Sequence, residues 1–198
     1  MPKTKKQFEE MRIATNEKIK NAGIKLFASK GFADTSVQDI ANLAGISTGL
    51  LYRHYKSKES LFYALVTQAG TALDEIKRVF QCDESPSILL NQVTQNILEE
   101  IKNDDNFSQY FVLIEQSFKL KDKMPQIQML IEKNIVLINQ TASLIDRGQK
   151  LGQFIDGNAY EMAILYFSII QGLVSVKSAL KDEFAIPDIK MVTAFLKK

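Results

Sequence analysis

Apolar residues recur along most of the chain at the three- and four-residue spacing of an amphipathic helix. Prolines occur only at positions 2, 86, 125 and 187, so long stretches contain no helix breaker. No convincing run of alternating polar and apolar residues predicts a β-strand. The pattern therefore predicts an all-α fold. The expected helices span residues 9–29, 36–44, 48–54, 58–80, 87–102, 106–119, 124–151, 158–181 and 187–197.

Several predicted helix ends carry residues that favour a cap. Thr35 and Gln38 have the Thr-x-x-Gln spacing of a capping box, which predicts that the second helix begins after Thr35. Asn158 suits the N-cap of a later helix. Pro187 suits the first position of the last helix, because proline lacks the N–H group that would be unpaired there.

The first helices have the order of a helix-turn-helix. The segment 36–44 is followed by Gly45, which tolerates the positive φ that a tight turn can require, and then by the short helix 48–54. We therefore expect an N-terminal helix-turn-helix domain over residues 1–58. A second helical domain is expected over residues 59–198, with the intervening long helix connecting the two.

The outward face of the helix 48–54 can be derived from its 100° turn per residue. If Leu51 faces the core, Arg53 points outward and Tyr52 lies on the flank. Arginine can pair with guanine and tyrosine can reach a phosphate, so this face suits the major groove of DNA. Ser47 and Thr48 stand at the N-terminal end of the helix, which is the end that usually contacts bases.

Two polar residues near this helix leave alternatives open. Lys58 opens the next helix, where its charge opposes the helix dipole unless an anion such as a DNA phosphate binds there. A solvated lysine paired with Glu59 explains the sequence equally well. His54 can position the DNA backbone or pack against the core.

The sequence offers little for catalysis or metal binding. The single histidine has no acid placed to orient it, and a zinc site needs more than one histidine or a pair of cysteines. Cys82 is the only cysteine. No phosphate-binding loop of the Gly-x-x-x-x-Gly-Lys type is present. We therefore expect no catalytic residue, no metal site, no cofactor and no enzymatic activity.

Composition and charge narrow the setting. Of the 198 residues, 45% are hydrophobic, which is enough for a core. Residues 1–58 hold 11 lysines and arginines against 5 acids, a net +6, so the other 140 residues carry −4 of the overall +2. A basic N-terminal third suggests an anionic partner. On the evidence of charge alone, chance clustering of lysines and arginines is an equally good explanation.

The expected location is the cytoplasm, without a membrane partner. No stretch approaches about 18 consecutive apolar residues. The basic N-terminus is not followed by the apolar segment of a secretory signal. A single cysteine fits a reducing compartment.

Ile19-x-x-Ala22-Gly23-x-x-Leu26-Phe27, Gly31-Phe32 and the run TSVQDIANLAGISTGLLYRHYKSKESL together resemble the DNA-binding domain of the tetracycline-repressor (TetR) family, over about residues 10–65. The resemblance implies a homodimeric transcriptional regulator, usually a repressor, that binds a palindromic operator in double-stranded DNA. It also implies a C-terminal domain with an inducer pocket and a dimer interface. Leu50 is bulkier than the residue often found at its position. By matching position, the implied DNA contacts are Thr35, Ser47, Thr48, Gly49, Tyr52, Arg53, His54 and Lys58.

A stripe of small residues suggests the dimer interface. Ser168, Gly172, Ser175 and Ala179 recur at helical spacing, and small side chains allow two helices to approach closely. Together with the last helix, this stripe could pair with its copy as a four-helix bundle. The alternative is packing against another helix of the same chain. The interface residues expected on the last helix are Val192, Phe195 and Leu196.

Aromatic residues on one predicted helix suggest a ligand pocket. They recur on one face of the helix 106–119, and the expected ligand is lipophilic or aromatic. Glu115 could bind a cationic group. The alternative is that these rings are ordinary core. The expected lining residues are Phe107, Tyr110, Phe111, Ile114, Glu115 and Phe118, with Tyr166, Phe167 and Gln171 from a later helix.

Two hypotheses from different functional classes follow. The leading one is a dimeric, ligand-responsive DNA-binding repressor that a small-molecule inducer releases from its operator. The alternative is a helical enzyme or small-molecule carrier whose basic N-terminal end is incidental.

Overall fold

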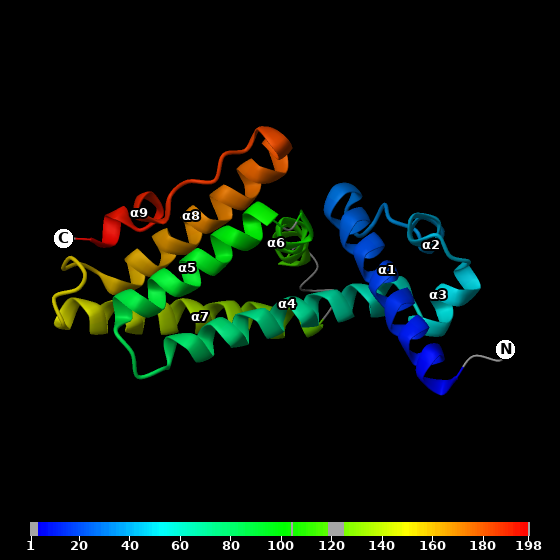
Figure 1. Cartoon of the computed structure of the whole chain (residues 1–198), viewed down its shortest axis with the longest axis horizontal. Coiled ribbons are helices and arrows are strands. Elements are labelled where there is room, and N and C mark those ends of the chain that lie inside the picture. The colour runs from blue at the N-terminus through cyan, green and yellow to red at the C-terminus, as the bar shows by residue number, and fades with distance from the viewer. Residues whose placement is uncertain (1–3, 104, 119–124, 198) are drawn as a thin grey trace.

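A long helix, α4, joins an N-terminal and a C-terminal group of helices (Figure 1). The computed structural model describes residues 4–103, 105–118 and 125–197, and all regular structure in these ranges is helical, so the predicted all-α fold is confirmed. The predicted helix ends at residues 119 and 124 lie outside these ranges. The elements are α1 (Lys5–Lys30), α2 (Val37–Ala44), α3 (Thr48–His54), α4 (Lys58–Phe80), α5 (Pro86–Asn103), α6 (Asp105–Phe118), α7 (Pro125–Lys150), α8 (Ala159–Leu180), η1 (Lys181–Glu183), α9 (Ile189–Val192) and η2 (Ala194–Leu196).

The largest departures from the predicted helices are at the two ends of the chain. α1 begins at Lys5 because Thr4 and Gln7 form a capping box, in which the Thr4 N–H donates to Gln7 Oε1 at 2.9 Å. The predicted helix 187–197 is two short helices instead. Its first helical residue follows Asp188, whose side chain accepts a hydrogen bond from the Lys190 N–H.

The capping box of α2 differs from the predicted one by one position. Ser36, not Thr35, is the N-cap, and its hydroxyl oxygen accepts from the Asp39 N–H at 3.0 Å. The Asp39 carboxylate accepts in return from the Ser36 N–H at 3.0 Å. The Thr35 hydroxyl turns the other way and donates to the Gly31 carbonyl at 2.7 Å, so it is unavailable as a cap.

The N-terminal core is not closed by the first helices alone. Phe62 of α4 packs edge-to-face against Phe27 and Phe32, with ring centroids 5.2 and 4.9 Å away. Leu113 of α6 and Leu130 of α7 are buried in the same cluster. The helix-turn-helix therefore rests on helices from the second half of the chain.

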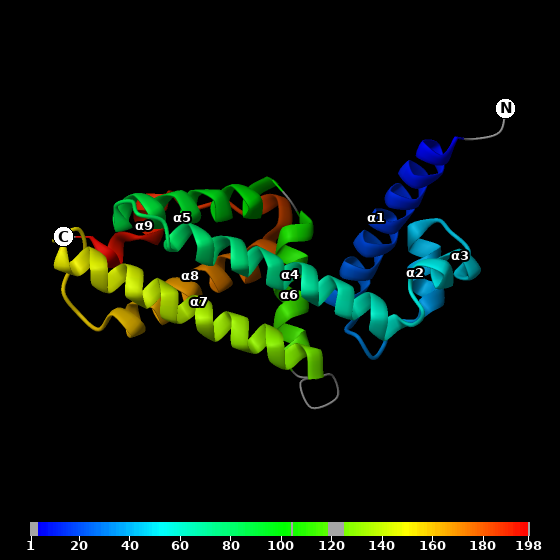
Figure 2. The ribbon, with the colours of Figure 1, turned by 90° about the horizontal axis from the view of Figure 1, so that it is seen from below.

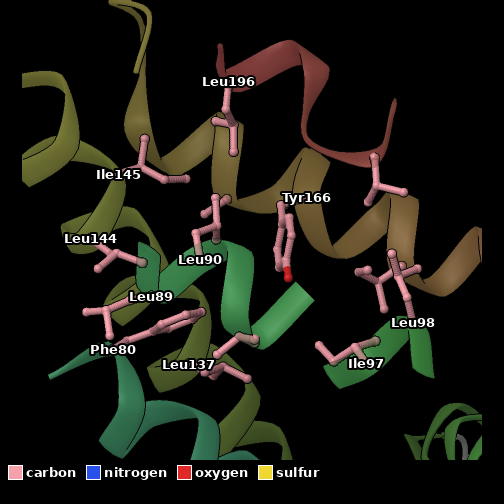
Figure 3. Packing of buried hydrophobic residues seen from close by; sticks show 14 of the residues in the cluster. Phe80, Leu89, Leu90, Ile97, Leu98, Leu137, Leu144, Ile145, Tyr166 and Leu196 are labelled. Atoms are coloured by element: carbon pink, nitrogen blue, oxygen red, sulfur yellow. The ribbon is translucent and has the colours of Figure 1, made fainter. Parts of the chain in front are cut away.

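The C-terminal core interleaves side chains from α5, α7, α8 and the C-terminal segment (Figure 3). Tyr166 lies at its centre, 0% exposed, with its hydroxyl 2.9 Å from the hydroxyl of Thr94. Because Thr94 gives its own proton to the Leu90 carbonyl at 2.6 Å, Tyr166 is the donor to Thr94. Burial raises the pKa of Tyr166 to about 12, so the phenol keeps this proton.

The helices α4, α6 and α7 each contribute side chains to both cores. α4 contributes Leu61, Phe62 and Leu65 to the N-terminal core and Phe80 to the C-terminal core. α6 lies across the long axis of the molecule and packs against both α1 and α8 (Figure 2). The boundary after residue 58 stays a prediction, and α4 belongs to both cores.

Candidate DNA interface, ligand cavity and dimer face

The turn between α2 and α3 is fixed by backbone bonds. Gly45 adopts a left-handed conformation, with φ of 67° and ψ of 36°, which costs glycine least. The Ile46 N–H then donates to the Ala41 carbonyl at 3.0 Å. Ser47 caps α3 by accepting from the Leu50 N–H at 3.2 Å. These contacts set the angle at which α3 leaves α2.

α3 presents a polar and aromatic outer face, as its helical periodicity predicts. Leu51 is 1% exposed and anchors the helix, whereas Tyr52 is 53% exposed and Arg53 is also exposed. At Gly49 a side chain would meet only the Ser47 hydroxyl, at 4.0 Å, so the backbone is open to an incoming partner. Among the other residues expected to contact DNA, Ser47 is exposed, and Thr48 and His54 are half-buried.

Lys58 has a role that neither sequence interpretation anticipated. Its ammonium group donates to the carbonyl oxygens of Phe32 and Thr35, both at 2.7 Å, and to that of Ala33 at 3.4 Å. These three bonds use all three ammonium donors and fasten the start of α4 to the α1–α2 connection. The phosphate contact stays a prediction from the sequence, and these bonds give a competing role whose expected salt dependence differs.

Thr35 is the least accessible of the residues expected to contact DNA. It is 1% exposed, and its hydroxyl is engaged with the Gly31 carbonyl. Its side chain is thus part of the packing beneath the turn. A DNA contact at this position stays a prediction.

A cavity of about 570 Å³ lies among α4, α5, α6, α7 and α8. Its wall on α6 is the aromatic face predicted from sequence, and α4 supplies a second wall. Seven of the nine residues expected to bind ligand line it: Phe107, Tyr110, Phe111, Ile114, Glu115, Phe118 and Gln171. Seven further residues line the cavity that were not expected from the sequence: Gln68, Ala69, Ala72, Leu73, Ile76, Ile97 and Asn134.

The α4 wall contains a pattern of small residues that is visible in the sequence. Ala69 and Ala72 stand on one side of a long helix, where small side chains leave room between packed helices. Nothing in the sequence shows, however, that this side of α4 meets α6.

Tyr166 and Phe167 are not among the residues that line this cavity, so a ligand contact at either position stays a prediction. Tyr166 points from α8 into the C-terminal core, and Phe167 packs beside it with ring centroids 5.2 Å apart. Gln171 is five residues after Tyr166, about 140° around the helix, and lines the cavity instead.

The small-residue stripe of α8 lies on the surface. Ser168, Gly172, Ser175 and Ala179 are all exposed, and a side chain built at Gly172 would meet nothing within 4 Å. Among the described residues, the stripe therefore does not pack against another helix of the same chain. Exposed apolar residues flank it: Ile164, Leu165, Val176 and Leu180.

The length and hydropathy of residues 159–183 also meet the criteria for a membrane span, with a mean hydropathy of 1.6. Helices of soluble proteins pass the same test. Only 22% of the most apolar 18-residue stretch of this segment is buried within the chain. The segment is therefore an apolar surface that the single chain leaves uncovered.

Two of the expected dimer residues belong to the chain's own core. Val192 is 3% exposed and Leu196 is 0% exposed, so their side chains are unavailable to a partner. The cause is the C-terminal segment, which folds back over the core. The Ile155 N–H donates to the Leu196 carbonyl at 3.1 Å and ties the segment to the α7–α8 connection. Phe195 is half-buried against the same core.

In the described residues, these features define an all-helical protein with an N-terminal helix-turn-helix. Residues 19–65 match the family model described as bacterial regulatory proteins, tetR family. This match, together with TetR-family relatives and structural neighbours, supports a TetR-family transcriptional regulator. Members of this family bind DNA and function as dimers.

Individual relatives are distant. The chain is 25% identical over 166 residues to the uncharacterized HTH-type transcriptional regulator YerO of Bacillus subtilis, covering 81% of this chain and 55% of YerO. It is 23% identical over 179 residues to the regulator TtgR of Pseudomonas putida, covering 87% of this chain and 82% of TtgR. The SmeT–triclosan complex, from Stenotrophomonas maltophilia, shares the fold with a TM-score of 0.65 at 20% identity, covering 93% of this chain and 92% of that one.

Proposed function

We propose that this TetR-family regulator is a dimeric repressor that acts in the cytoplasm and leaves a palindromic operator when a small lipophilic molecule binds it. The observation that carries the proposal is the position of α6. This helix supplies the aromatic wall of the cavity and also packs against α1. Ligand in the cavity thus touches an element that supports the DNA-binding helices.

The proposed DNA contact is the outer face of α3. Arg53 would pair with a base edge in the major groove, and Tyr52 would reach a phosphate at the side. Ser47, Thr48 and Gly49 at the N-terminal end of the same helix, and His54 at its C-terminal end, complete the proposed contact surface.

The proposed dimer forms through α8. Its exposed apolar residues and small-residue stripe would be covered by the same face of a second copy, as in an isologous two-fold interface. Two recognition helices presented by a two-fold dimer read successive major grooves about 34–36 Å apart, which is why the proposed operator is palindromic.

The proposed release mechanism is a shift between two conformations. A ligand changes DNA affinity only by as much as its own affinity differs between the two states. The contact that supports such a coupling is the bond from Gln116 Nε2 on α6 to the Ala28 carbonyl near the end of α1, at 3.2 Å. Movement of the α6 aromatic wall would thereby change the support of α1. The triclosan held by SmeT favours a small molecule as the trigger.

The test begins with selection of bound sequences from a random DNA pool, followed by titration of the selected DNA at several salt concentrations. A palindromic consensus bound by a dimer, with weaker binding at higher salt, supports the proposal. Binding without sequence preference would favour the enzyme or carrier hypothesis. Small lipophilic compounds are then screened for release of the selected DNA.

A further inference from the structure

We propose that the cavity binds a lipophilic monocation, with the positive group held at Glu115 and the apolar body directed toward α4 and α5. The inference rests on the proposed function only in taking this cavity as the ligand site. It adds the sign of the ligand's charge and the end of the ligand that carries it.

The charge of the cavity has one source. Among the described residues that line it, Glu115 alone is charged, and no lysine or arginine is present. Glu115 takes part in none of the ion pairs found in the described part of the chain. Its carboxylate accepts one long bond, from Gln171 Nε2 at 3.4 Å, which leaves acceptor capacity for a cation. An anionic ligand would meet this carboxylate without a lysine or arginine in the described lining to offset it.

Aromatic residues of α6 line the same cavity as this carboxylate. Phe107 and Phe111 pack with ring centroids 5.1 Å apart and an interplanar angle of 55°, and Tyr110 and Phe118 also line the cavity. Ring faces attract a cation within about 6 Å of their centroids, most strongly where water is displaced. A carboxylate with aromatic neighbours therefore favours a soft organic cation over a strongly hydrated one.

The exposure of the lining residues gives the orientation. Glu115, Phe118 and Gln171 are exposed, as are Gln68 and Ala72 of α4, so these residues mark the mouth of the cavity. Ala69 and Ile97 are buried and form the inner wall. A ligand with its charge at one end can keep that end at Glu115 and bury the rest. The volume of about 570 Å³ suits a single drug-sized molecule.

The test compares two dyes that differ by one methyl group and one charge. The cation is the N-methylpyridinium form of 4-(4-dimethylaminostyryl)pyridine, and the neutral probe is its unmethylated parent at mildly alkaline pH. Each is titrated by calorimetry onto the full-length protein, onto Glu115→Gln, and onto Glu100→Gln, an exposed acid on α5 that does not line the cavity. Glutamine at 115 keeps the shape and removes the charge.

The wild-type protein should bind the cation about tenfold more tightly than the neutral dye, the size expected for one partly solvated ion pair. Glu115→Gln should lose this preference and change the affinity for the neutral dye less than about twofold, whereas Glu100→Gln should behave as wild type. Equal affinity of the wild type for both dyes, a preference retained by Glu115→Gln, or failure of both dyes to bind would overturn the proposal.

Release of the selected DNA separates this proposal from the proposed function. If the neutral dye releases DNA without any charge preference, the ligand-responsive regulator stands and the cation site fails. If the cation is preferred through Glu115 and neither dye releases DNA, the cation site stands and the release mechanism fails.

Discussion

The ammonium group of Lys58 lies 4.4 Å from the centre of the Phe32 ring while donating to the Phe32 carbonyl oxygen. One side chain at the start of α4 thus holds both the backbone and the ring of the α1–α2 connection. The phenyl ring supplies a cation–π contact, and the carbonyl groups supply charge-assisted hydrogen bonds.

Removing this contact should destabilise the N-terminal core. Lys58→Met keeps the length of the side chain but leaves three carbonyl groups without their donor, and we expect the free energy of unfolding to fall by about 1–2 kcal/mol. Lys56→Met, at an exposed lysine two residues earlier, should change it by less than about 0.5 kcal/mol. Denaturant unfolding of the two variants checks the difference.

The salt dependence of DNA binding distinguishes this role from a phosphate contact. With Lys58 bound to carbonyls, the slope of log K against log salt should be the same in Lys58→Met as in wild type. A slope that falls by about one would show that the lysine contacts a phosphate in the complex.

Arg53 should carry sequence preference. Arg53→Ala is expected to weaken binding to the selected operator by about 1–3 kcal/mol and binding to random DNA much less, because a two-pronged base contact discriminates between sequences. Arg53→Lys keeps the charge but not the fork, so it should recover random binding and only part of the preference. Equal losses on both DNAs would instead indicate a phosphate contact.

Gly172→Leu should separate the dimer without unfolding the chain. A Cβ atom built at this position meets no atom of the same chain within 4 Å, and the residue is exposed, so a larger side chain has room there. At a close helix crossing between copies, the added bulk should cost the dimer about 1–3 kcal/mol. Light scattering over a dilution series measures the dissociation, with Gln95→Leu on the exposed side of α5 as the control. An unchanged dimer would move the interface away from this stripe.

Gln116→Leu should uncouple ligand from DNA. The variant loses the bond to the Ala28 carbonyl but alters no residue that lines the cavity or the outer face of α3. Ligand affinity and DNA affinity measured separately should stay within about twofold of wild type, while the ligand's effect on DNA affinity should shrink. Full release of DNA by ligand in this variant would show that coupling runs through other contacts, with α4 as the next candidate.

The α6 side of the cavity could be predicted because it depends only on angle. Phe107, Phe111, Ile114 and Phe118 follow the helical repeat, and any packing of α6 keeps them on one face. α8 is apolar on nearly all sides, so its helical repeat does not indicate which face meets the core. Tyr166 was therefore assigned to the cavity although it lies in the core.

Contacts between distant parts of the sequence were not predictable in the same way. The charge of Lys58 opposes the dipole of its own helix, but the carbonyl groups that bind it lie 23 to 26 positions earlier in the chain. At α2, Thr35 and Ser36 both offer a hydroxyl with an acceptable partner three residues later. Which of the two residues becomes the N-cap depends on the Gly31 carbonyl, which accepts the hydrogen bond of the Thr35 hydroxyl only once the turn has folded.

The sharing of α4 between two cores limits how such a protein can be divided or recombined. A fragment ending at residue 58 would lack Leu61, Phe62 and Leu65, and its remaining apolar residues would face water. The N-terminal helices are thus not expected to fold as a separate fragment. The whole chain should unfold in one cooperative transition. New ligand responses in a protein built this way must arise by substitutions within the cavity, because exchanging the C-terminal half would also remove part of the support of the recognition helix.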